Sequence, residues 1–349
     1  MQNYNLQQIN YPKKLQPIFQ KLISLNIKPI IVGGFVRDFF LGFGSKDIDV
    51  ELYNIDDFNK LKKILNKFGS LNVVGKSFGV CKLHVDGLEI DFSLPRQDSK
   101  ISKGHKGFKI VTNSKLTFKE ASSRRDFTIN AMGYDIKNNT FLDPFNGQKD
   151  IKNKILRAVD DEKFKEDPLR VLRGVGFCAR FGFEMSKELK ELCKTMIQNK
   201  ELEELSKQRV FEELKKLMLK SKKPSVGFVL LKELSQNIYL DMPKQEFELF
   251  LNLVDTTPKT KQINKTINLI QECLKDKIYL EKLTLHVEKL KAPKPIIQGR
   301  ELVEMGLKPS KEFKKILDEA LKAQLNKEFT NLQEGREWLI NYLKNHSSS

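Results

Sequence analysis

The chain has 349 residues, of which 40% are hydrophobic and 31% are charged, so it carries enough apolar side chains to form folded cores. Its 62 Lys and Arg residues exceed its 45 Asp and Glu residues, and the resulting net charge of +17 indicates a polyanionic partner, either nucleic acid or an anionic membrane surface. The pattern excludes a membrane span of about 18 apolar residues and a signal peptide. The four scattered cysteines form no disulfide framework or zinc motif, and we expect a cytoplasmic protein.

The first 142 residues are expected to form a mixed α/β domain. Short runs with β-branched and aromatic residues at alternate positions predict strands, whereas spacings of three and four predict helices. The expected strands are residues 29–32, 48–52, 73–74, 80–85 and 88–92, and the expected helices are residues 35–41 and 57–68. These elements place two glycines directly after the first strand.

Beyond residue 143 the pattern is helical and strand signals disappear. Helices are expected at residues 169–181, 187–196, 208–219 and 225–234, between 245 and 290, and at 311–325 and 333–343, with a linker at 291–295. The sequence therefore predicts an α+β protein with four regions. We expect these to be residues 1–142, 143–205, 206–290 and 291–349.

The strongest chemical signal is the segment GGFVRDFFLGFGSKDIDVELY, which begins at Gly33. A strand that ends in Gly33 and Gly34 lets the backbone approach a ligand and directs the next helix N-terminus at it, which suits a phosphate. Asp47 and Asp49 then project from one face of the next strand, where their repulsion favours a bound divalent cation. Asp91, in LEIDFSLPR, is either a third carboxylate or a solvated strand end.

Arginine is used sparingly, yet six of the 11 arginines fall between residues 124 and 180. In the segment SRRDFTINAMGYD, Arg125, Asp126 and Asn130 offer donors to phosphate and an acceptor to ribose hydroxyls. The alternative is that Asp126 caps a helix while Arg124 lies in solvent.

The segment EDPLRVLRGVGF places Asp167, Arg170 and Arg173 three residues apart along a helix. An aspartate beside an arginine supplies an acceptor and donors for the pairing edge of a base. The alternative is an ordinary N-cap at Asp167 followed by an Asp–Arg helix salt bridge.

The blocks GGFVRD with the D-x-D pair, RRDFTINA, LDPFNGQKDI and EDPLR occur in an order that resembles the class II tRNA nucleotidyltransferases (CCA-adding enzymes) and bacterial poly(A) polymerases. The resemblance covers about residues 31–183 and returns in 296–325. It implies a nucleotidyltransferase palm as head, then helical neck, body and tail. The activity it implies is template-independent addition of CCA to tRNA 3′ ends from CTP and ATP, with two Mg²⁺ ions and no obligate protein partner.

The resemblance also implies residue roles. Asp47 and Asp49 bind the metal ions and act in catalysis with Asp91, whereas Gly33, Gly34 and Arg37 bind the triphosphate. Further nucleotide-binding residues are Arg125, Asp126, Asn130, Glu166, Asp167, Arg170 and Arg173, with Asp167 and Arg170 as the protein template and Glu166 orienting Arg170. Asp143, Gly147 and Asp150 form a hinge, Arg209 and Glu213 brace the neck, and residues 97–112 match a flexible loop.

One departure is Gly176, where the family commonly has an arginine. The strand segment VVGKSFGVCKLHVDG resembles CCA-type sequences more than poly(A) polymerases. Alternatives are addition of A alone, poly(A) synthesis, or a non-catalytic RNA-binding protein.

Overall fold

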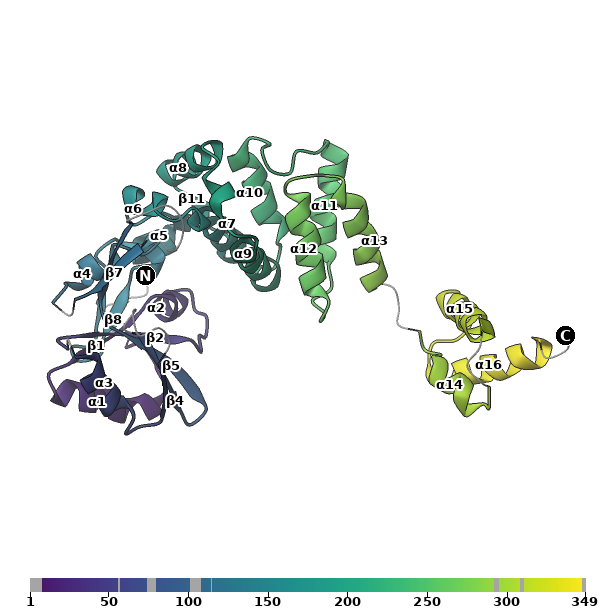
Figure 1. Ribbon diagram of the computed structural model, residues 1–349, viewed down its shortest axis with the longest axis horizontal. Helices are drawn as coiled ribbons and strands as arrows, with labels where there is room; N and C mark the ends of the chain where they lie inside the picture. The colour runs from purple at the N-terminus through teal and green to yellow at the C-terminus, as the bar shows by residue number, and fades with distance from the viewer. Residues whose placement is uncertain are drawn as a thin grey trace. The chain divides into compact units, whose positions relative to one another are not determined.

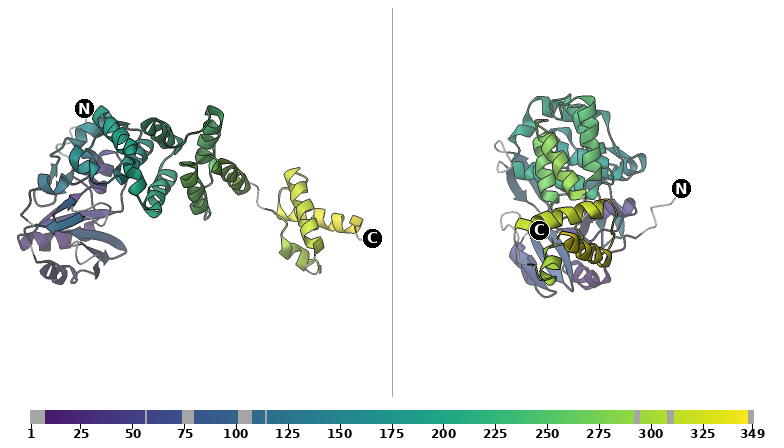
Figure 2. Two further views of the ribbon diagram at one scale, coloured as in Figure 1. Left: turned by 45° about the horizontal axis from the view of Figure 1, so that its top comes forward. Right: turned by 90° about the vertical axis from the view of Figure 1, so that its right-hand side faces the viewer.

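The computed structural model describes residues 8–55, 57–73, 80–100, 108–113, 115–291, 295–307 and 311–346 (Figures 1 and 2). The chain divides into two compact units, Met1–Leu283 and Thr284–Ser349. The first unit begins with a mixed sheet and continues as helices, and the second is helical, so the predicted α+β class is confirmed. Among the described helices, none has the length and hydropathy to cross a bilayer.

A seven-stranded sheet forms the first part of the first unit, in the order β3-β4-β5-β2-β1-β8-β9. Its strands are β1 (Lys28–Val32), β2 (Ile48–Tyr53), β3 (Ser70–Val73), β4 (Val80–Val85), β5 (Leu88–Ser93), β8 (Gly133–Asp135) and β9 (Thr140–Leu142). Within this sheet the pair β2–β5 is parallel, and the other described pairs of the sheet are antiparallel. The strand expected at 73–74 lies earlier, and β8 and β9 were not predicted because three residues carry too little alternation.

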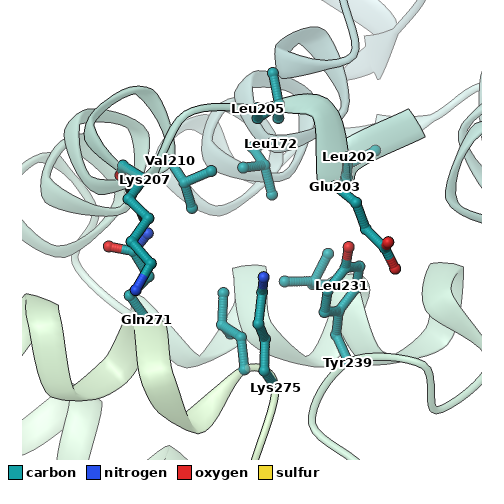
Figure 3. A pocket seen from close by; sticks show the side chains of 11 residues that line it. Leu172, Leu202, Glu203, Leu205, Lys207, Val210, Leu231, Tyr239, Gln271 and Lys275 are labelled. Carbon is teal, nitrogen blue, oxygen red and sulfur yellow. Dashed lines mark hydrogen bonds between the residues drawn. The ribbon is translucent and has the colours of Figure 1, made fainter. Parts of the chain in front are cut away.

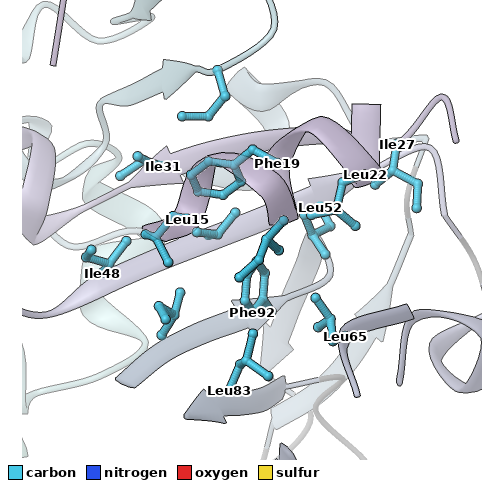
Figure 4. Close-up of a cluster of buried hydrophobic side chains, with 14 of the residues drawn as sticks. Leu15, Phe19, Leu22, Ile27, Ile31, Ile48, Leu52, Leu65, Leu83 and Phe92 are labelled. Carbon is cyan, nitrogen blue, oxygen red and sulfur yellow. The ribbon is translucent and has the colours of Figure 1, made fainter. Parts of the chain in front are cut away.

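The two faces of the sheet are covered differently because successive side chains point to opposite sides. Ile31 belongs to the large core beneath α1 (Gln16–Ser24) and α3 (Phe58–Leu65), together with Phe19, Leu65 and Phe92 (Figure 4). Its neighbours on β1 pack on the other face in a smaller cluster beside α4 (Phe118–Ser122). Burial of each large side chain contributes roughly 1.5–3 kcal/mol, so the first face dominates the stability of the sheet.

The segment predicted as a flexible loop, residues 97–112, has ordered arms. β6 (Arg96–Lys100) and β7 (Phe108–Thr112) pair as a separate antiparallel hairpin. The residues between these strands, 101–107, which include the segment SKGHKG, lie outside the described residues.

A short helix, η4 (Thr128–Asn130), precedes β8. The helical part of the first unit follows β9 and contains α5 (Gly147–Asn153), α6 (Asp161–Lys165), α7 (Leu169–Phe181), α8 (Lys187–Gln198), η5 (Glu201–Glu204), α9 (Lys207–Lys220), α10 (Ser225–Ser235), α11 (Lys244–Thr256) and α12 (Ile263–Cys273). α7 packs against α9 and α10, and α9 packs against α12. The expectation of no strand beyond residue 143 is wrong in one place, because β10 (Ile155–Leu156) pairs with β11 (Glu184–Met185). A two-residue ladder has no periodicity to read.

α13 (Tyr279–Lys291) spans the division between the units, and residues 292–294 of the predicted linker lie outside the described residues. The second unit contains α14 (Gly299–Glu304), α15 (Lys311–Leu325) and α16 (Leu332–His346). Its own core includes Ile297, Leu302, Phe329 and Leu339, and Trp338 stacks on Tyr342.

Candidate functional site

Three aspartates gather on the sheet face opposite the large core. Asp47 immediately precedes β2, and Asp49 is the second residue of that strand, between Ile48 and Val50 of the core. In the parallel pair β2–β5, Asp49 is the direct register partner of Asp91. The sequence prediction of Asp91 on a neighbouring strand is therefore confirmed at the level of the backbone.

The charges around Asp49 are crowded. Partial desolvation raises the pKa of Asp49, Arg125 lowers it, and Asp91, Asp47 and Glu51 raise it further. Asp47 and Asp49 both reach solvent. This arrangement of oxygen donors suits Mg²⁺, which binds to one or two carboxylates and completes its shell with water and substrate phosphates.

Asp91 differs from the other two aspartates because it has a lysine partner. Lys82 Nζ lies 3.2 Å from Asp91 Oδ1 and 2.6 Å from Glu89 Oε1. Within the described residues, no group of three or more His, Cys, Asp or Glu side chains is arranged to hold a metal ion. The geometry therefore fits a pair of carboxylates, Asp47 and Asp49, better than a set of three.

Sequence analysis missed Glu51, although its signal was present. Glu51 lies two residues after Asp49 and so shares its face of β2. It is 1% exposed and accepts hydrogen bonds from Arg125 Nη2 at 2.9 Å and Arg124 Nη2 at 3.2 Å. Burial acts to raise the pKa of Glu51, but the two arginines and the hydroxyl of Tyr53 hold it below the usual value. Arg124 therefore forms an ion pair, and the alternative that it lies in solvent is wrong.

The glycine turn lies beside this pair. Gly33 has φ 70° and ψ −126°, a conformation that side chains disfavour, and it leads into α2 (Gly34–Phe40). A Cβ atom built on Gly33 would lie 2.7 Å from Arg125 Nη1. The missing side chain thus makes room for the arginine that binds Glu51.

Arg37, predicted to bind triphosphate, is buried and already engaged. Its Nε donates to Asp38 Oδ1 at 2.8 Å, and its Nη1 donates to Asn130 Oδ1 at 2.7 Å. The guanidinium also lies over the rings of Phe177 and Phe181, at 5.4 and 5.0 Å. Arg37 thus connects α2 to η4 and α7.

The same chain of contacts continues through Asp126. Asn130 Nδ2 donates to Asp126 Oδ1 at 2.9 Å, and Arg173 Nε donates to Asp126 Oδ2 at 2.8 Å. Burial acts to raise the pKa of Asp126, yet the Arg173 charge and the Asn130 hydrogen bond hold it below the usual value. Arg173 also lies 3.8 Å from Glu213 of α9. Asp126 is therefore no helix cap, because its acceptor oxygens serve Asn130, Arg173 and the Phe127 amide.

Asp167 and Arg170, the predicted template pair, do not bind each other's side chains in the described contacts. Both carboxylate oxygens of Asp167 accept from Arg209 Nη2, at 3.0 and 2.9 Å, and Oδ1 also accepts from the Leu169 amide. Arg170 donates to the carbonyls of Lys163 and Arg124, at 2.8 and 2.6 Å. The N-cap of α7 is Pro168, so the alternative that Asp167 is the N-cap is wrong, although its side chain does accept from the first helical amide. The alternative of an Asp–Arg helix salt bridge is also wrong, because Asp167 pairs with Arg209. Glu166 ends α6 as its C-cap.

The predicted hinge residues are closely packed. Asp143 accepts from the amides of Gly147 and Gln148 at 2.7 and 3.0 Å, and so binds the start of α5. A Cβ atom on Gly147 would lie 2.4 Å from the Thr128 carbonyl oxygen, and the Thr128 hydroxyl donates to Asp150 at 2.7 Å.

A separate pocket lies within the helical part, away from the residues predicted for the site. It has a cavity volume of about 50 Å³ and lies among α7, η5, α9, α10 and α12 (Figure 3). Leucines form its wall, and Lys207, Glu203, Tyr239 and Lys275 surround it.

Comparison with protein families gives two matches. Residues 30–157 match the family described as "Poly A polymerase head domain", and residues 182–236 match "Probable RNA and SrmB- binding site of polymerase A". The first match contains the aspartates, the glycine turn and the RRDFTINA block. The second contains α8, α9 and α10.

Curated relatives carry related names. The chain is 39% identical over 206 residues to the Multifunctional CCA protein of Pseudoalteromonas atlantica, covering 58% of this chain and 48% of the relative. It is 40% identical over 209 residues to the CCA-adding enzyme of Buchnera aphidicola subsp. Baizongia pistaciae, covering 59% and 47%. The chain thus spans about half the length of these curated relatives.

Solved structures share the fold over almost the whole chain. "The structure of CCA-adding enzyme apo form II" has a TM-score of 0.63 at 20% identity and covers 95% of this chain and 97% of its own. "Thermotoga maritima CCA-adding enzyme complexed with tRNA_CCA" has a TM-score of 0.63 at 19% identity and covers 97% and 99%. The carboxylate face and the glycine turn both lie within residues 30–157, so this part of the chain is similar to the family described as "Poly A polymerase head domain".

Proposed function

We propose that this protein adds CCA to the 3′ ends of tRNA, without a nucleic-acid template, from CTP and ATP. The observation that carries the proposal is the pair of exposed carboxylates, Asp47 and Asp49, on a face otherwise supported by paired charges. This face lies in the region that is 39–40% identical to the two relatives with CCA in their names.

Asp47 and Asp49 would hold two Mg²⁺ ions. When bound, the metal would lower the pKa of the attacking hydroxyl and neutralise charge on the triphosphate. Asp91 lies opposite Asp49 and is held by Lys82, so we propose that it supports the metal-binding pair from the neighbouring strand.

The proposed reaction is a nucleotidyl transfer. The 3′ oxygen of tRNA forms a bond to the α-phosphorus, the bond from that phosphorus to the bridging oxygen breaks, and pyrophosphate leaves with the electron pair. The hydroxyl proton passes to solvent. Gly33 and Gly34 would lie against the triphosphate, and Arg37 would fix their turn through Asn130. Arg125 would hold positive charge beside the carboxylates while bound to Glu51.

Nucleotide choice would depend on Asp167 and Arg170, oriented by Glu166. Their present partners, Arg209 and two backbone carbonyls, would be exchanged for the base. In this proposal Asp167→Ala changes the ratio of CTP to ATP incorporation more than it slows either reaction. Arg209→Met is the matched control, because it frees Asp167 without removing its carboxylate. Unchanged selectivity in Asp167→Ala would contradict the template role.

The helices and the second unit would bind tRNA through shape and phosphate charge. The net charge of +17 supports a salt-dependent attraction to RNA. The match of residues 182–236 to a family described as a probable RNA-binding site supports the same assignment. We propose a cytoplasmic location, since the four cysteines are free and buried.

The deciding experiment supplies three tRNA transcripts: one that ends before CCA, one that ends in C, and one that ends in CC. Each is incubated with Mg²⁺ and CTP, ATP or both, and product lengths are resolved on a gel. We expect additions that stop at CCA. Products from the CC transcript alone would indicate A-only activity, long products would indicate poly(A) synthesis, and RNA binding without extension would indicate a non-catalytic binder.

A further inference from the structure

Arg180, on the last turn of α7, has a different environment from the other arginines of this region. Arg37, Arg125 and Arg173 each bind a carboxylate. Among the described residues, Arg180 has no carboxylate within ion-pair distance and no hydrogen-bond acceptor. Its described contact is with the ring of Phe181, 4.6 Å from the guanidinium carbon. Desolvation and the nearby charge of Arg37 lower the pKa of Arg180, and the charge of Asp38 opposes this shift only in part.

The exposed ring of Phe43 lies on Phe181, the same phenylalanine that Arg180 contacts. Phe43 stacks on Phe181 with a centroid distance of 6.1 Å and an interplanar angle of 23°. Phe43 is 53% exposed, so its other face is open. Phe181 is itself stacked on Phe177, and Arg37 lies over both rings. Phe43 therefore presents an exposed aromatic ring on a stack that Phe181, Phe177 and Arg37 support.

The chain connects this ring to the carboxylates. Phe43 lies in the segment between α2 and β2, four residues before Asp47, and this spacing limits their separation to no more than about 14 Å. Gly176, one helical turn before Arg180 on α7, would have no atom within 4 Å of an added Cβ. The helix surface one turn before Arg180 is therefore open at Gly176.

We propose that Phe43 and Arg180 form a subsite for the 3′-terminal nucleotide of the RNA acceptor, with its base stacked on Phe43 and its phosphate bound by Arg180. Stacking on an aromatic face accepts any base, as an acceptor end whose terminal base changes at each step requires. An unpaired guanidinium supplies the complementary charge for phosphate. This inference rests on the proposed function for its ligand, but its residues are separate from the carboxylates and from Asp167 and Arg170.

The test compares Phe43→Ala, Phe43→Trp and Arg180→Met with the wild-type chain. Extension of tRNA that ends before CCA gives separate KM values for tRNA and for CTP, and fluorescence anisotropy gives tRNA affinity without catalysis. We expect Phe43→Ala to raise the KM for tRNA about tenfold, with Phe43→Trp close to wild type. Arg180→Met should weaken tRNA binding and reduce the slope of log affinity against log salt by about 0.7. Phe58→Ala, which removes a ring beneath Lys62 on α3, away from the helices proposed to bind tRNA, is the matched control.

The outcomes separate this inference from the proposed function. Normal extension with unchanged tRNA KM in Phe43→Ala and Arg180→Met would overturn the subsite and leave the function standing. A rise in the KM for CTP alone would assign the platform to the incoming nucleotide and overturn the acceptor assignment. If the wild type binds tRNA without extending it, weaker binding by both variants would still support the subsite while the catalytic proposal fails. Equal loss in Phe58→Ala would also overturn the subsite, since the effect would then be structural.

Discussion

The carboxylate face of β2 and β5 carries the exposed Asp47 and Asp49. At the junction of α2, η4 and α7, in contrast, Asp38 and Asp126 are paired with arginines. Both regions lie within the first unit, and both depend on residues that the sequence motifs contain. On the carboxylate face, desolvation and then the charges of Asp91 and Asp47 raise the pKa of Asp49, against the opposing effect of Arg125. At the junction, Arg173 helps to hold the pKa of Asp126 below its usual value. Carboxylates without a full complement of cations thus indicate where a ligand binds, whereas ion pairs within the protein indicate where the fold is stabilised.

The largest expected effect is on activity, through the carboxylate face of β2 and β5. Asp49→Asn should lower the rate of nucleotide addition at least about a thousandfold, or roughly 4 kcal/mol of activation free energy, because half of the proposed metal-binding pair loses its charge. The melting temperature should stay the same or rise, since the substitution relieves repulsion from Asp47 and Asp91. Glu89→Gln, which changes a nearby carboxylate bound to Lys82, is the control and should remain active. A near-normal rate in Asp49→Asn would remove the distinction between the two regions.

At the junction the expected effect is on stability. Asp126→Asn should lower the free energy of unfolding by about 2–3 kcal/mol, a value reduced because Arg173 is partly exposed. Urea denaturation measures this loss. The double variant Asp126→Asn with Arg173→Met should recover part of it, because no arginine is then left unpaired. If the single variant is as stable as wild type, the pair does not support the fold.

The turn at Gly33 lies between the two regions. Two glycine variants separate its effect on stability from its effect on activity. Gly33→Ala and Gly42→Ala both place a side chain at a φ of about 70°, which costs about 1–2 kcal/mol of stability. In Gly33→Ala alone the new Cβ also displaces Arg125, which binds Glu51. We therefore expect similar losses in thermal stability but a lower addition rate only in Gly33→Ala. Equal rates would show that the position of Arg125 does not affect the site.

The smallest expected effect is on the pH dependence of stability. The folded pKa of Asp126 lies below its unfolded value of about 3.9, so the unfolded chain takes up this proton first as pH falls. The contribution of Asp126 is thus present above about pH 4 and lost as pH falls through the lower folded pKa. Asp126→Asn should flatten the acid limb of a plot of unfolding free energy against pH. An unchanged acid limb would mean that Asp126 has the same pKa in both states.

Much of the local structure follows from sequence periodicity. The helix predicted at residues 169–181 is α7, and the alternation that predicted β2 also places Asp49 on the face opposite Ile48 and Val50. The same alternation includes Glu51, whose role the D-x-D spacing alone does not reveal because its arginine partners come from residues 124 and 125. Short elements such as β8 and β10 were missed because their backbone pairing comes from distant strands.

The sequence by itself determined which residues carry the chemistry: a glycine turn, two aspartates two positions apart, and a cluster of arginines. It did not determine the partner of each arginine. Arg37 binds Asn130 from 93 positions away, and Arg173 binds Asp126 from 47 positions away. Periodicity describes only neighbours on one element, whereas ion pairs depend on how elements pack. Tertiary structure therefore decided that Arg37, Arg125 and Arg173 support the site while Arg180 keeps a guanidinium available for a ligand.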